Sequence, residues 1–439
     1  MKEFEQFTSA GQMRSVFQRM LPGFAHGNPE ITDCVRLHTR FRTFLKPGSR
    51  GKSSLSATWK LVTANRTSGQ RAEQLLYARS FLGGRSRNEF ERAMNRRLVP
   101  VSNGAALTHL AALDMVVWSF PNDPAIPHLP EVTDRNRVRR HLPWQHLAVS
   151  RDELDALDLG IISYRPEERC TTRYRLHTQG QLHALYAKTF ADERGREIHE
   201  RMNQLRAASL SDADSFLIAR PLLYDADLRT IWQEELPGTP LAEALSRSSL
   251  NELLGATGRG LARLHSSALN CAERIALADH LAEARKKAAK LSQAFPHLSA
   301  ELQEVISDLA AQMPHLSDAP LRLIHGDFHL RQMLLCAERL ALFDFDELAH
   351  GDPLQDLANF IADLYSAESD DDIRRAMAAA LLKGWEQHAD CELDAERLVW
   401  HLRMQFLTRA YRAYWQIKPD LENVVRRFIA LSRRGVKGW

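Results

Sequence analysis

Hydrophobic residues recur every three to four positions over most of the second half of the chain. From about residue 246 to the end, this spacing is clear around Leu253 and Leu261, over 281–312 and over 396–431. Apolar side chains three and four residues apart fall on one face of an α-helix. We therefore expect a domain of amphipathic helices in this half.

One segment, residues 320–346, interrupts the helical pattern. It holds two apolar runs, Leu321-Arg-Leu-Ile324 and Leu340-Ala-Leu-Phe343, and each run ends in a cluster of polar residues. Short apolar runs with polar ends are typical of buried strands or of the arms of a β-hairpin. The segment therefore predicts a small β-structure inside the helical domain.

The first half has a different pattern. Residues 1–40 are typical of one or two short helices and a lead-in, whereas residues 41–245 mix short strand-like runs with turns. Two stretches of this β-rich part carry the same motifs in the same order. The motifs of the first are Phe44-Leu-Lys-Pro47, Trp59-Lys-Leu61, Leu76-Tyr-Ala-Arg-Ser-Phe81, the helix-like 87–94 and Trp118. Those of the second are Ser163-Tyr-Arg-Pro166, Tyr174-Arg-Leu176, Leu185-Tyr-Ala-Lys-Thr-Phe190, the helix-like 196–202 and Trp232.

This internal repeat predicts two copies of a small antiparallel sheet with one helix, here called the first copy and the second copy. The copies differ mainly by an insertion over Thr63–Arg71, between the second and third strand-like runs. Hairpin loops accept insertions at low cost in free energy. The alternative is a chance likeness between two unrelated segments.

Composition narrows the class of protein. The chain has 439 residues, which corresponds to two or three domains. Hydrophobic residues make up 44% and charged residues 26%, which excludes a disordered chain, a collagen and a coiled coil. We find neither an apolar run long enough to span a membrane nor the apolar core of a signal peptide. Five dispersed cysteines are typical of reduced thiols in a cytoplasmic protein, and a net charge of +3 gives no indication of nucleic-acid binding.

The strongest chemical signal is His325-Gly-Asp-Phe-His-Leu-Arg-Gln332, followed by the apolar run that ends at Asp344. Phosphoryl transfer to a hydroxyl needs a carboxylate that orients the hydroxyl, oxygen ligands for Mg²⁺ and a cation near the phosphates. Asp327 is the candidate carboxylate, and Gln332 offers an amide oxygen to a metal. Asp344, at the mouth of a buried strand, would need a counter-charge or a metal. The alternative is that these acids only cap turns.

These residues resemble the aminoglycoside phosphotransferase and choline kinase-like family, a branch of the protein-kinase fold. The family loop H-G-D-x-H-x-x-N is matched by His325, Asp327 and His329, and Gln332 in place of Asn is similar to the maltokinase branch. The segment Gly351-Asp-Pro-Leu-Gln-Asp-Leu-Ala358 is similar to a second family motif. The resemblance covers roughly residues 160–365.

The resemblance implies roles for these residues. Asp327 would be the catalytic base, with His329 in the same loop, and Gln332 and Asp344 would hold Mg²⁺. Asp356 would brace the loop, and the helix containing Leu261-Ala-Arg-Leu-His265 would pack beneath it. The resemblance also implies a hinge over Trp232-Gln-Glu-Glu-Leu-Pro-Gly238, where the main chain of Glu235 and Leu236 would contact adenine.

Lys188 is the candidate cation. Strand alternation puts it on the face of Tyr186 and Phe190, where a lysine needs an anion, unless it lies at a sheet edge and extends into water. The resemblance implies a catalytic role at the phosphates for this third-strand lysine. Its partner is expected on the next helix, where Glu197 flanks the apolar stripe and Glu200 points away from it. We prefer Glu197, and Glu200 remains the alternative.

Two departures from the family pattern stand out. The segment Arg165-Pro-Glu-Glu-Arg-Cys-Thr-Thr172 has no glycine where a phosphate-covering loop is expected, so Arg169, Thr171 or Thr172 would serve instead. The first copy carries Arg79 where the second carries Lys188, and it has no helical lobe of its own. We expect the first copy to be non-catalytic, with a scaffold, dimerising or substrate-capping role.

The sequence therefore predicts an α+β, protein-kinase-like fold. The expected domains are a non-catalytic module (1–150), a kinase-like N-lobe (151–240) and a helical C-lobe with the catalytic loop (241–439). The expected function is ATP- and Mg²⁺-dependent phosphorylation of a hydroxyl on a small molecule, such as a sugar or amino-sugar. The alternative is a catalytically silent scaffold that binds a ligand. A protein kinase is disfavoured because no Ala-Pro-Glu segment follows Asp344. We expect no nucleic acid or membrane partner, and homo-oligomers could form through residues 1–150.

Overall fold

The computed structural model describes residues 2–45, 52–147, 149–209, 214–316, 321–367 and 370–436. Lys46 and Pro47 of the first repeat motif lie outside the described residues. The chain divides into two compact units. The first comprises Met1–Arg196, Leu222–Gln233 and Tyr414–Pro419, and the second comprises Glu197–Pro221, Glu234–Ala413 and Asp420–Trp439.

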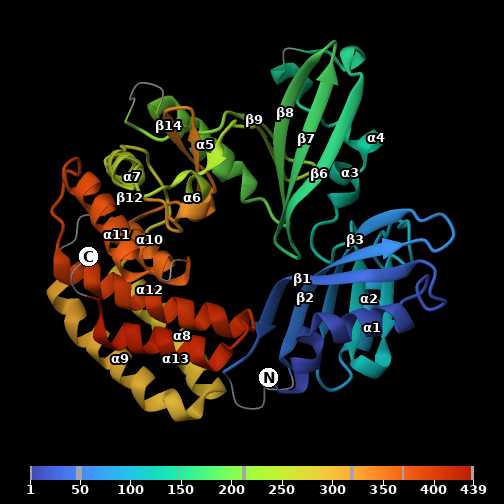
Figure 1. Ribbon diagram of the computed structural model, residues 1–439, viewed down its shortest axis with the longest axis horizontal. Helices are drawn as coiled ribbons and strands as arrows, with labels where there is room; N and C mark the ends of the chain where they lie inside the picture. Colours follow the sequence, from blue (N-terminus) through green and yellow to red (C-terminus); the bar gives the residue numbers. More distant parts are fainter. Residues whose placement is uncertain are drawn as a thin grey trace. The chain divides into compact units, whose positions relative to one another are not determined.

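The first unit contains two five-stranded sheets, and Figure 1 labels β1–β3 of one and β6–β9 of the other. The strands of the first are β1 (Glu30–Arg42), β2 (Ser54–Ala64), β3 (Arg71–Ser80), β4 (Leu107–Leu110) and β5 (Met115–Ser119). Those of the second are β6 (Ala156–Arg165), β7 (Arg169–Thr178), β8 (Gln181–Phe190), β9 (Pro221–Asp225) and β10 (Thr230–Glu234). The orders are β1-β2-β3-β5-β4 and β6-β7-β8-β10-β9, so the two sheets have the same topology.

A helix follows the third strand of each sheet, α2 (Ser86–Met94) in the first and α5 (Gly195–Ser209) in the second. Both helices lie where the repeat predicts them. The predicted insertion is the longer β2–β3 loop, residues 65–70, which compares with residues 179–180 between β7 and β8. From Glu197 onward α5 belongs to the second unit. Besides α2, the α-helices of the first unit are α1 (Ala10–Met20), α3 (Leu129–Thr133) and α4 (Arg135–Val138).

The expected start of the β-rich part, about residue 41, was wrong, because β1 begins at Glu30. β1 is an edge strand, and only Ile31, Cys34, Thr39 and Phe41 in it are buried. Its other positions are polar apart from the exposed Val35 and Leu37, and two bulges break its alternation. An edge strand of this kind lacks the clear period of two that identifies a half-buried strand.

One hydrophobic cluster joins the two sheets of the first unit. Tyr77 and Trp118 of the first sheet belong to it together with Tyr164 and Cys170 of the second. The rings of Tyr77 and Trp118 stack with their centroids 5.3 Å apart. Burying each large side chain contributes about 2–3 kcal/mol, so the two copies share a core.

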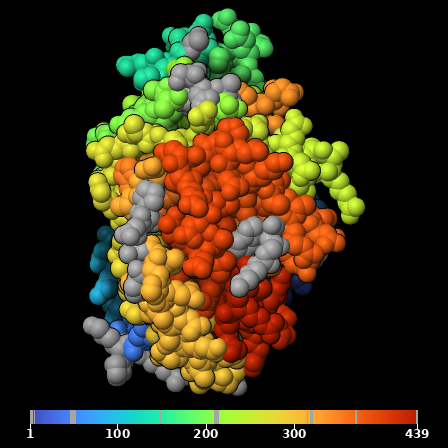
Figure 2. All heavy atoms as spheres, turned by 90° about the vertical axis from the view of Figure 1, so that its left-hand side faces the viewer, coloured from blue at the N-terminus to red at the C-terminus, as the bar shows by residue number. Residues whose placement is uncertain are grey.

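The second unit is mainly helical. Its helices are α6 (Leu241–Ala244), α7 (Leu250–His265), α8 (Leu277–Ala294), α9 (Ser299–Gln312), α10 (Leu354–Ala367), α11 (Asp371–Glu386), α12 (Ala395–Trp415) and α13 (Leu421–Arg434). α12 extends by two residues into the first unit. In Figure 2 the orange and red C-terminal residues cover the middle of the face in view, and the amber residues near 300 lie beside them. The predicted helical domain is confirmed.

Helices α7 and α11 pack closely because glycines lie at their contact. A Cβ on Gly258 would lie 2.2 Å from the carbonyl oxygen of Leu381, and a Cβ on Gly384 would lie 2.2 Å from that of Gly255. The two backbones therefore touch directly, and any side chain at either glycine would force the helices apart.

The interruption in the helical domain contains short strands, as predicted. β12 (Arg322–Ile324) pairs with β15 (Ala349–Gly351), and β13 (Met333–Cys336) forms a hairpin with β14 (Arg339–Leu342). β11 (Thr239–Pro240) adds to the hairpin through β13. The α+β class is thus confirmed. Among the helices described, none is long and apolar enough to cross a membrane.

Candidate active site

Asp327 lies in the second unit, in the loop that leaves β12. Gly326 precedes it with φ of 84°, a left-handed conformation that favours glycine. A Cβ at this position would lie 2.3 Å from the carbonyl oxygen of Glu347. Only glycine can therefore form this turn, which sets the direction of the next residue, Asp327.

The carboxylate of Asp356, at the start of α10, anchors this loop. It accepts hydrogen bonds from the backbone N–H groups of His325 (2.7 Å) and Gly326 (2.9 Å). His265 Nε2 lies 3.2 Å from the same carboxylate, and Trp385 Nε1 donates to His265 Nδ1 at 2.9 Å. Since indole can only donate, Nδ1 must accept, so the His265 proton is on Nε2 and points to Asp356. The bracing role that the resemblance implied for Asp356 is confirmed.

Three side chains surround the carboxylate of Asp327. Gln332 Nε2 donates to Oδ2 at 3.2 Å, and Asn359 Nδ2 donates to Oδ1 at 3.4 Å. His329 Nε2 lies 3.6 Å from Oδ2. The side chain of Asp327 is 34% exposed, so it is held on one side and open to solvent on the other.

Asp327 is an unusually strong acid. Burial raises the pKa of this carboxyl, but the hydrogen-bonding contact and charge of His329, with the charges of Arg412 and His325, lower it to about 2. Histidines are protonated at the low pH where carboxyls titrate, so they favour the charged form. Asp327 is therefore a carboxylate at neutral pH. It is better suited to orient a hydroxyl than to remove its proton early, as a loose phosphoryl-transfer transition state requires.

We expect His329→Gln to raise the pKa of Asp327. The variant removes the largest of the effects that lower this pKa and leaves burial, which raises it, in place. The carboxyl carbon signal of Asp327 in an NMR pH titration would report the change. An unchanged or lower midpoint would contradict the dominant effect of His329.

Two further residues position Asp327, and the sequence did not identify them. Arg409 Nη2 donates to the backbone oxygen of Asn359 at 2.8 Å and to its Oδ1 at 3.0 Å. Since Oδ1 faces the guanidinium, the amide nitrogen of Asn359 faces Asp327. Asn359 directly follows the second family motif, which was the available signal. Arg409 lies in α12, where periodicity does not reveal a buried arginine.

Gln332 and Asp344 come together through the β13–β14 hairpin. The backbone N–H of Phe343 donates to the carbonyl oxygen of Gln332 at 3.1 Å. His325 Nε2, from the loop, contacts the carbonyl oxygen of Phe343 at 3.2 Å. Asp344 follows with φ of 70° and is half-buried. The two candidate metal ligands and the loop are therefore connected through the main chain of Gln332 and Phe343 and the side chain of His325.

The amide oxygen of Gln332 suits a hard cation. Gln332 Nε2 faces Asp327, and Oε1 is buried with no hydrogen-bond partner among the residues that the structure describes. A buried oxygen acceptor without a donor is rare, and a cation would satisfy it. The described chain holds no cluster of three or more His, Cys, Asp or Glu suited to a metal. Mg²⁺ does not need one, because it often takes one or two protein oxygens plus phosphates and water.

Lys188 lies on β8 in the first unit and is half-buried. Its Nζ lies 5.5 Å from the ring centroid of Phe190, so both side chains share one face, as alternation predicts. The opposite face, with Leu185 and Ala187, packs into the hydrophobic core of this sheet. Lys188 is therefore on the more polar face of the sheet.

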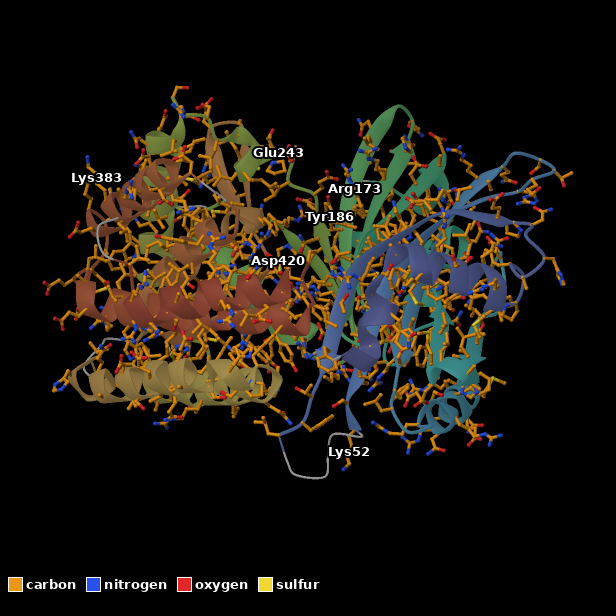
Figure 3. All side chains as sticks on the ribbon, turned by 60° about the horizontal axis from the view of Figure 1, so that its bottom comes forward. Lys52, Arg173, Tyr186, Glu243, Lys383 and Asp420 are labelled. Atoms are coloured by element: carbon orange, nitrogen blue, oxygen red, sulfur yellow. The ribbon has the colours of Figure 1, made fainter. Side chains whose placement is uncertain are left out.

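The β7–β8 register shows what accompanies Lys188. Thr171 is paired with Lys188, and Arg173 with Tyr186, so these side chains share a face. Figure 3 labels Arg173 and Tyr186, which lie beside each other on the green strands. Thr172 is paired with Ala187 on the buried face and is 1% exposed. The expectation that Thr172 could serve phosphates was wrong, because alternation turns it into the core.

The two acids considered as partners of Lys188 both lie on α5. Glu197 is 64% exposed, and Arg201 Nη2 lies 3.2 Å from its Oε2. Glu200 is exposed. Glu235 and Leu236 lie in the extended segment between β10 and β11 and are half-buried. The partner of Lys188 and the role of this segment stay predictions.

Comparison with known proteins gives a family match and several similar structures. The model described as "Phosphotransferase enzyme family" matches residues 169–391. No curated protein sequence matches the chain.

Three solved structures are similar to the chain. Aminoglycoside phosphotransferase APH(3'')-Id of Streptomyces rimosus, with ADP and streptomycin, is 19% identical, covers 54% of this chain and 90% of its own, with a TM-score of 0.40. A thermostable mutant of aminoglycoside phosphotransferase APH(4)-Ia, with ADP and hygromycin B, is 16% identical. The match covers 65% of this chain and 97% of that protein, with a TM-score of 0.46. Ethanolamine kinase of Plasmodium vivax is 12% identical. The match covers 67% of this chain and 88% of that protein, with a TM-score of 0.44.

The family match spans more than half of the 439 residues and contains the loop with Asp327, the hairpin with Asp344 and the anchor Asp356. It agrees with the protein-kinase-like fold and the phosphotransferase activity that the sequence predicts. The chain belongs to the phosphotransferase enzyme family.

Proposed function

We propose that the protein transfers the γ-phosphoryl group of ATP to a hydroxyl of a small molecule such as a sugar or amino-sugar. The observation that carries this proposal is the placement of Asp327, a half-buried carboxylate held by Gln332 and Asn359 on a loop anchored by Asp356. Two of the similar structures are complexes with ADP and streptomycin and with ADP and hygromycin B, which supports an acceptor of this class.

Asp327 would orient the acceptor hydroxyl and receive its proton. Gln332 and Asn359 hold the carboxylate from two sides, which limits its rotation. A fixed acceptor of this kind lowers the entropy cost of bringing the hydroxyl in line with the phosphorus. His329 would keep the carboxylate ionised.

Gln332 and Asp344 would hold Mg²⁺ when the nucleotide is bound. The partnerless Oε1 of Gln332 supports this assignment, since amide and carboxylate oxygens are suitable ligands. The metal would neutralise charge on the β- and γ-phosphates. Asp344 would contribute the negative charge of the pair, and Gln332 a neutral oxygen.

Lys188 would bind phosphates, with Glu197 as its partner. The first copy supports the choice of Glu197 by analogy. There, Arg79 stands in the place of Lys188, and its Nη1 lies 3.8 Å from Glu89 on α2, ten residues later in the chain. Glu197 lies nine residues after Lys188, whereas Glu200 lies twelve residues after it. We further propose that main-chain groups of Glu235 and Leu236 contact adenine.

The roles of residues 1–150 and of the whole protein in the cell are proposals as well. The shared strand order and core support a duplicated, non-catalytic module over 1–150, followed by an N-lobe over 151–240 and a C-lobe over 241–439. All five cysteines are free thiols, which agrees with a cytoplasmic setting. Homo-oligomers through residues 1–150 remain part of this proposal.

A silent scaffold is the second candidate, favoured by the glycine-free segment between β6 and β7. A measurement of nucleotide binding distinguishes the kinase proposal from the scaffold proposal. We expect millimolar ATP with Mg²⁺ to stabilise the protein by about 2.7 kcal/mol once its concentration is about 100-fold above Kd. Asp344→Asn should remove most of the Mg²⁺-dependent part, because it removes the charged ligand. Calorimetry and thermal melting measure both.

Asp372→Asn is the matched control, because its side chain is 89% exposed and lies far along the chain from the loop. It should retain the full shift. If the parent protein shows neither a shift nor heat of binding with ATP and Mg²⁺, the scaffold proposal replaces the kinase proposal. If ATP does bind, a screen of sugars, aminoglycosides and amino alcohols for ATP consumption would identify the acceptor.

A further inference from the structure

The turn between β6 and β7, residues 165–169, has an unusual composition for this fold. It has acids at its tip, Glu167 and Glu168, and no glycine. Glu167 has φ of 64°, a left-handed conformation that costs a residue with a side chain about 1 kcal/mol. The surrounding structure must hold the turn in this shape.

Two arginines of the first copy bind the carboxylate of Glu167. Arg42 Nη2 donates to Oε2 at 2.7 Å, and Arg79 Nη1 donates to Oε1 at 3.0 Å. The side chains of Arg79 and Glu167 are each 15% exposed, so solvent screens their attraction less than at the surface. Glu168 is paired with Arg40. Each acid at the tip therefore has a basic partner in β1 or β3.

The backbone N–H groups at the tip of the turn also form hydrogen bonds within the protein. The N–H of Glu167 donates to Asp123 Oδ2 at 3.1 Å, and the hydroxyl of Tyr164 donates to the same oxygen at 2.7 Å. The N–H of Glu168 donates to the carbonyl oxygen of Arg165 at 3.1 Å. A loop that covers phosphates offers its N–H groups to them. Here both N–H groups at the tip are bonded within the protein.

We propose that the β6–β7 turn is a docking element and not a phosphate-binding loop, and that Arg42 and Arg79 form an anion site that Glu167 fills. Arg79 occupies in the first copy the place that Lys188 occupies in the second. A carboxylate of the same chain thus takes, in the first copy, the position that phosphates take in the second. Only this comparison with Lys188 rests on the proposed function.

The docking has two consequences for nucleotide binding. The first copy cannot accept a nucleotide at Arg79, because Glu167 already supplies the anion. In the second copy, phosphate contacts fall to the strand face that carries Lys188 and Thr171 rather than to the turn. Residues 1–150 therefore act as the receptor for the turn and fix the N-lobe to which it belongs.

Hydrogen exchange measured by mass spectrometry on the full chain tests the docking. We expect Glu167→Gln to speed amide exchange in residues 164–168 at least about tenfold, because the ion pairs that hold the turn are lost. Arg79→Met should also speed exchange in the turn, but less, because Arg42 still holds Glu167. The double variant should exchange about as fast as Glu167→Gln alone, because that substitution already breaks the pair with Arg79. Asp158→Asn is the control. It removes an exposed acid at the other end of β6, which pairs with His177, and should leave exchange in the turn unchanged.

Kinetics then test whether the turn contacts phosphates. We expect Glu167→Gly, which restores the glycine of a phosphate-covering loop, to leave KM for ATP within about twofold of the parent. If KM falls tenfold in Glu167→Gly, or if exchange in the turn is unchanged in Glu167→Gln, the proposal is wrong. If Glu167→Gln does not fold, Arg42→Met removes one of the two arginines and gives the same readout. The exchange measurement needs no activity, so it judges the docking even if the protein is not a kinase.

Discussion

Asp327→Asn is expected to lower kcat about 10³-fold, within the range of general base catalysis, and to leave Kd for ATP within about twofold. In the proposed mechanism the carboxylate acts on the acceptor hydroxyl and not on the nucleotide, so the loss would belong to the chemical step. Asparagine has nearly the same shape but no charge. Its amide nitrogen would meet the donor groups of Gln332 and Asn359, which now face the carboxylate. Steady-state kinetics with the acceptor and calorimetry with ATP measure the two quantities.

The nucleotide affinity of the variant is its own control for folding. Asp344→Asn provides the contrast, since it should weaken Mg²⁺-dependent binding as well as turnover. Equal and small effects of the two substitutions would show that the catalytic and metal-binding acids have been misassigned. A large loss of ATP affinity in Asp327→Asn would instead place this residue at the metal.

The second large effect is expected on stability. Asp356→Asn should destabilise the protein by about 2–4 kcal/mol, because a fully buried carboxylate accepts from His325, Gly326 and His265. Asparagine has one acceptor oxygen and would turn an N–H toward another donor. The melting temperature should fall by roughly 5–10 °C. Activity should fall too, since the loop that carries Asp327 loses its anchor.

Asp372→Asn serves again as the control and should melt within about one degree of the parent. Trp385→Phe gives an intermediate test of the same network. It removes the donor to His265 Nδ1, which frees the His265 proton to move to Nδ1 and break the contact with Asp356. If Asp356→Asn melts at the same temperature as the parent protein, the hydrogen bonds of Asp356 contribute nothing to the free energy of unfolding.

Much of the candidate active site could be located from the sequence because its signal is local in sequence. Asp327, Gln332 and Asp344 lie within twenty residues of one another, and the loop and hairpin that bring them together are formed by that same segment. The helices of the second unit have the apolar period that packing on a core imposes. The repeat predicted two αβ modules because strand, helix and tryptophan follow in the same order.

Other features depend on contacts between distant residues and could not be predicted. Arg409 meets Asn359 across fifty positions, and nothing in α12 distinguishes it from an exposed arginine. Glu167 accepts a hydrogen bond from Arg79, which lies eighty-eight positions earlier in the chain. From the sequence alone, the turn was therefore interpreted as a phosphate-covering loop that lacks glycine. Thr172 was one of three candidates for contacting phosphates because the strand register was unknown, and a shift of one residue reverses the face.

The direct contact of α7 and α11 at their glycines acts as a fixed spacer for the catalytic loop. His265 ends α7 and Trp385 lies at the end of α11, and their hydrogen bond leads to Asp356. Backbone touching backbone leaves no side chain that could adjust the gap by changing rotamer. The distance between Trp385 and His265 is therefore set by the main-chain contact at Gly258, which lies two helical turns before His265. A methyl group added at Gly258 would push α7 and α11 apart and would therefore shift the loop that carries Asp327.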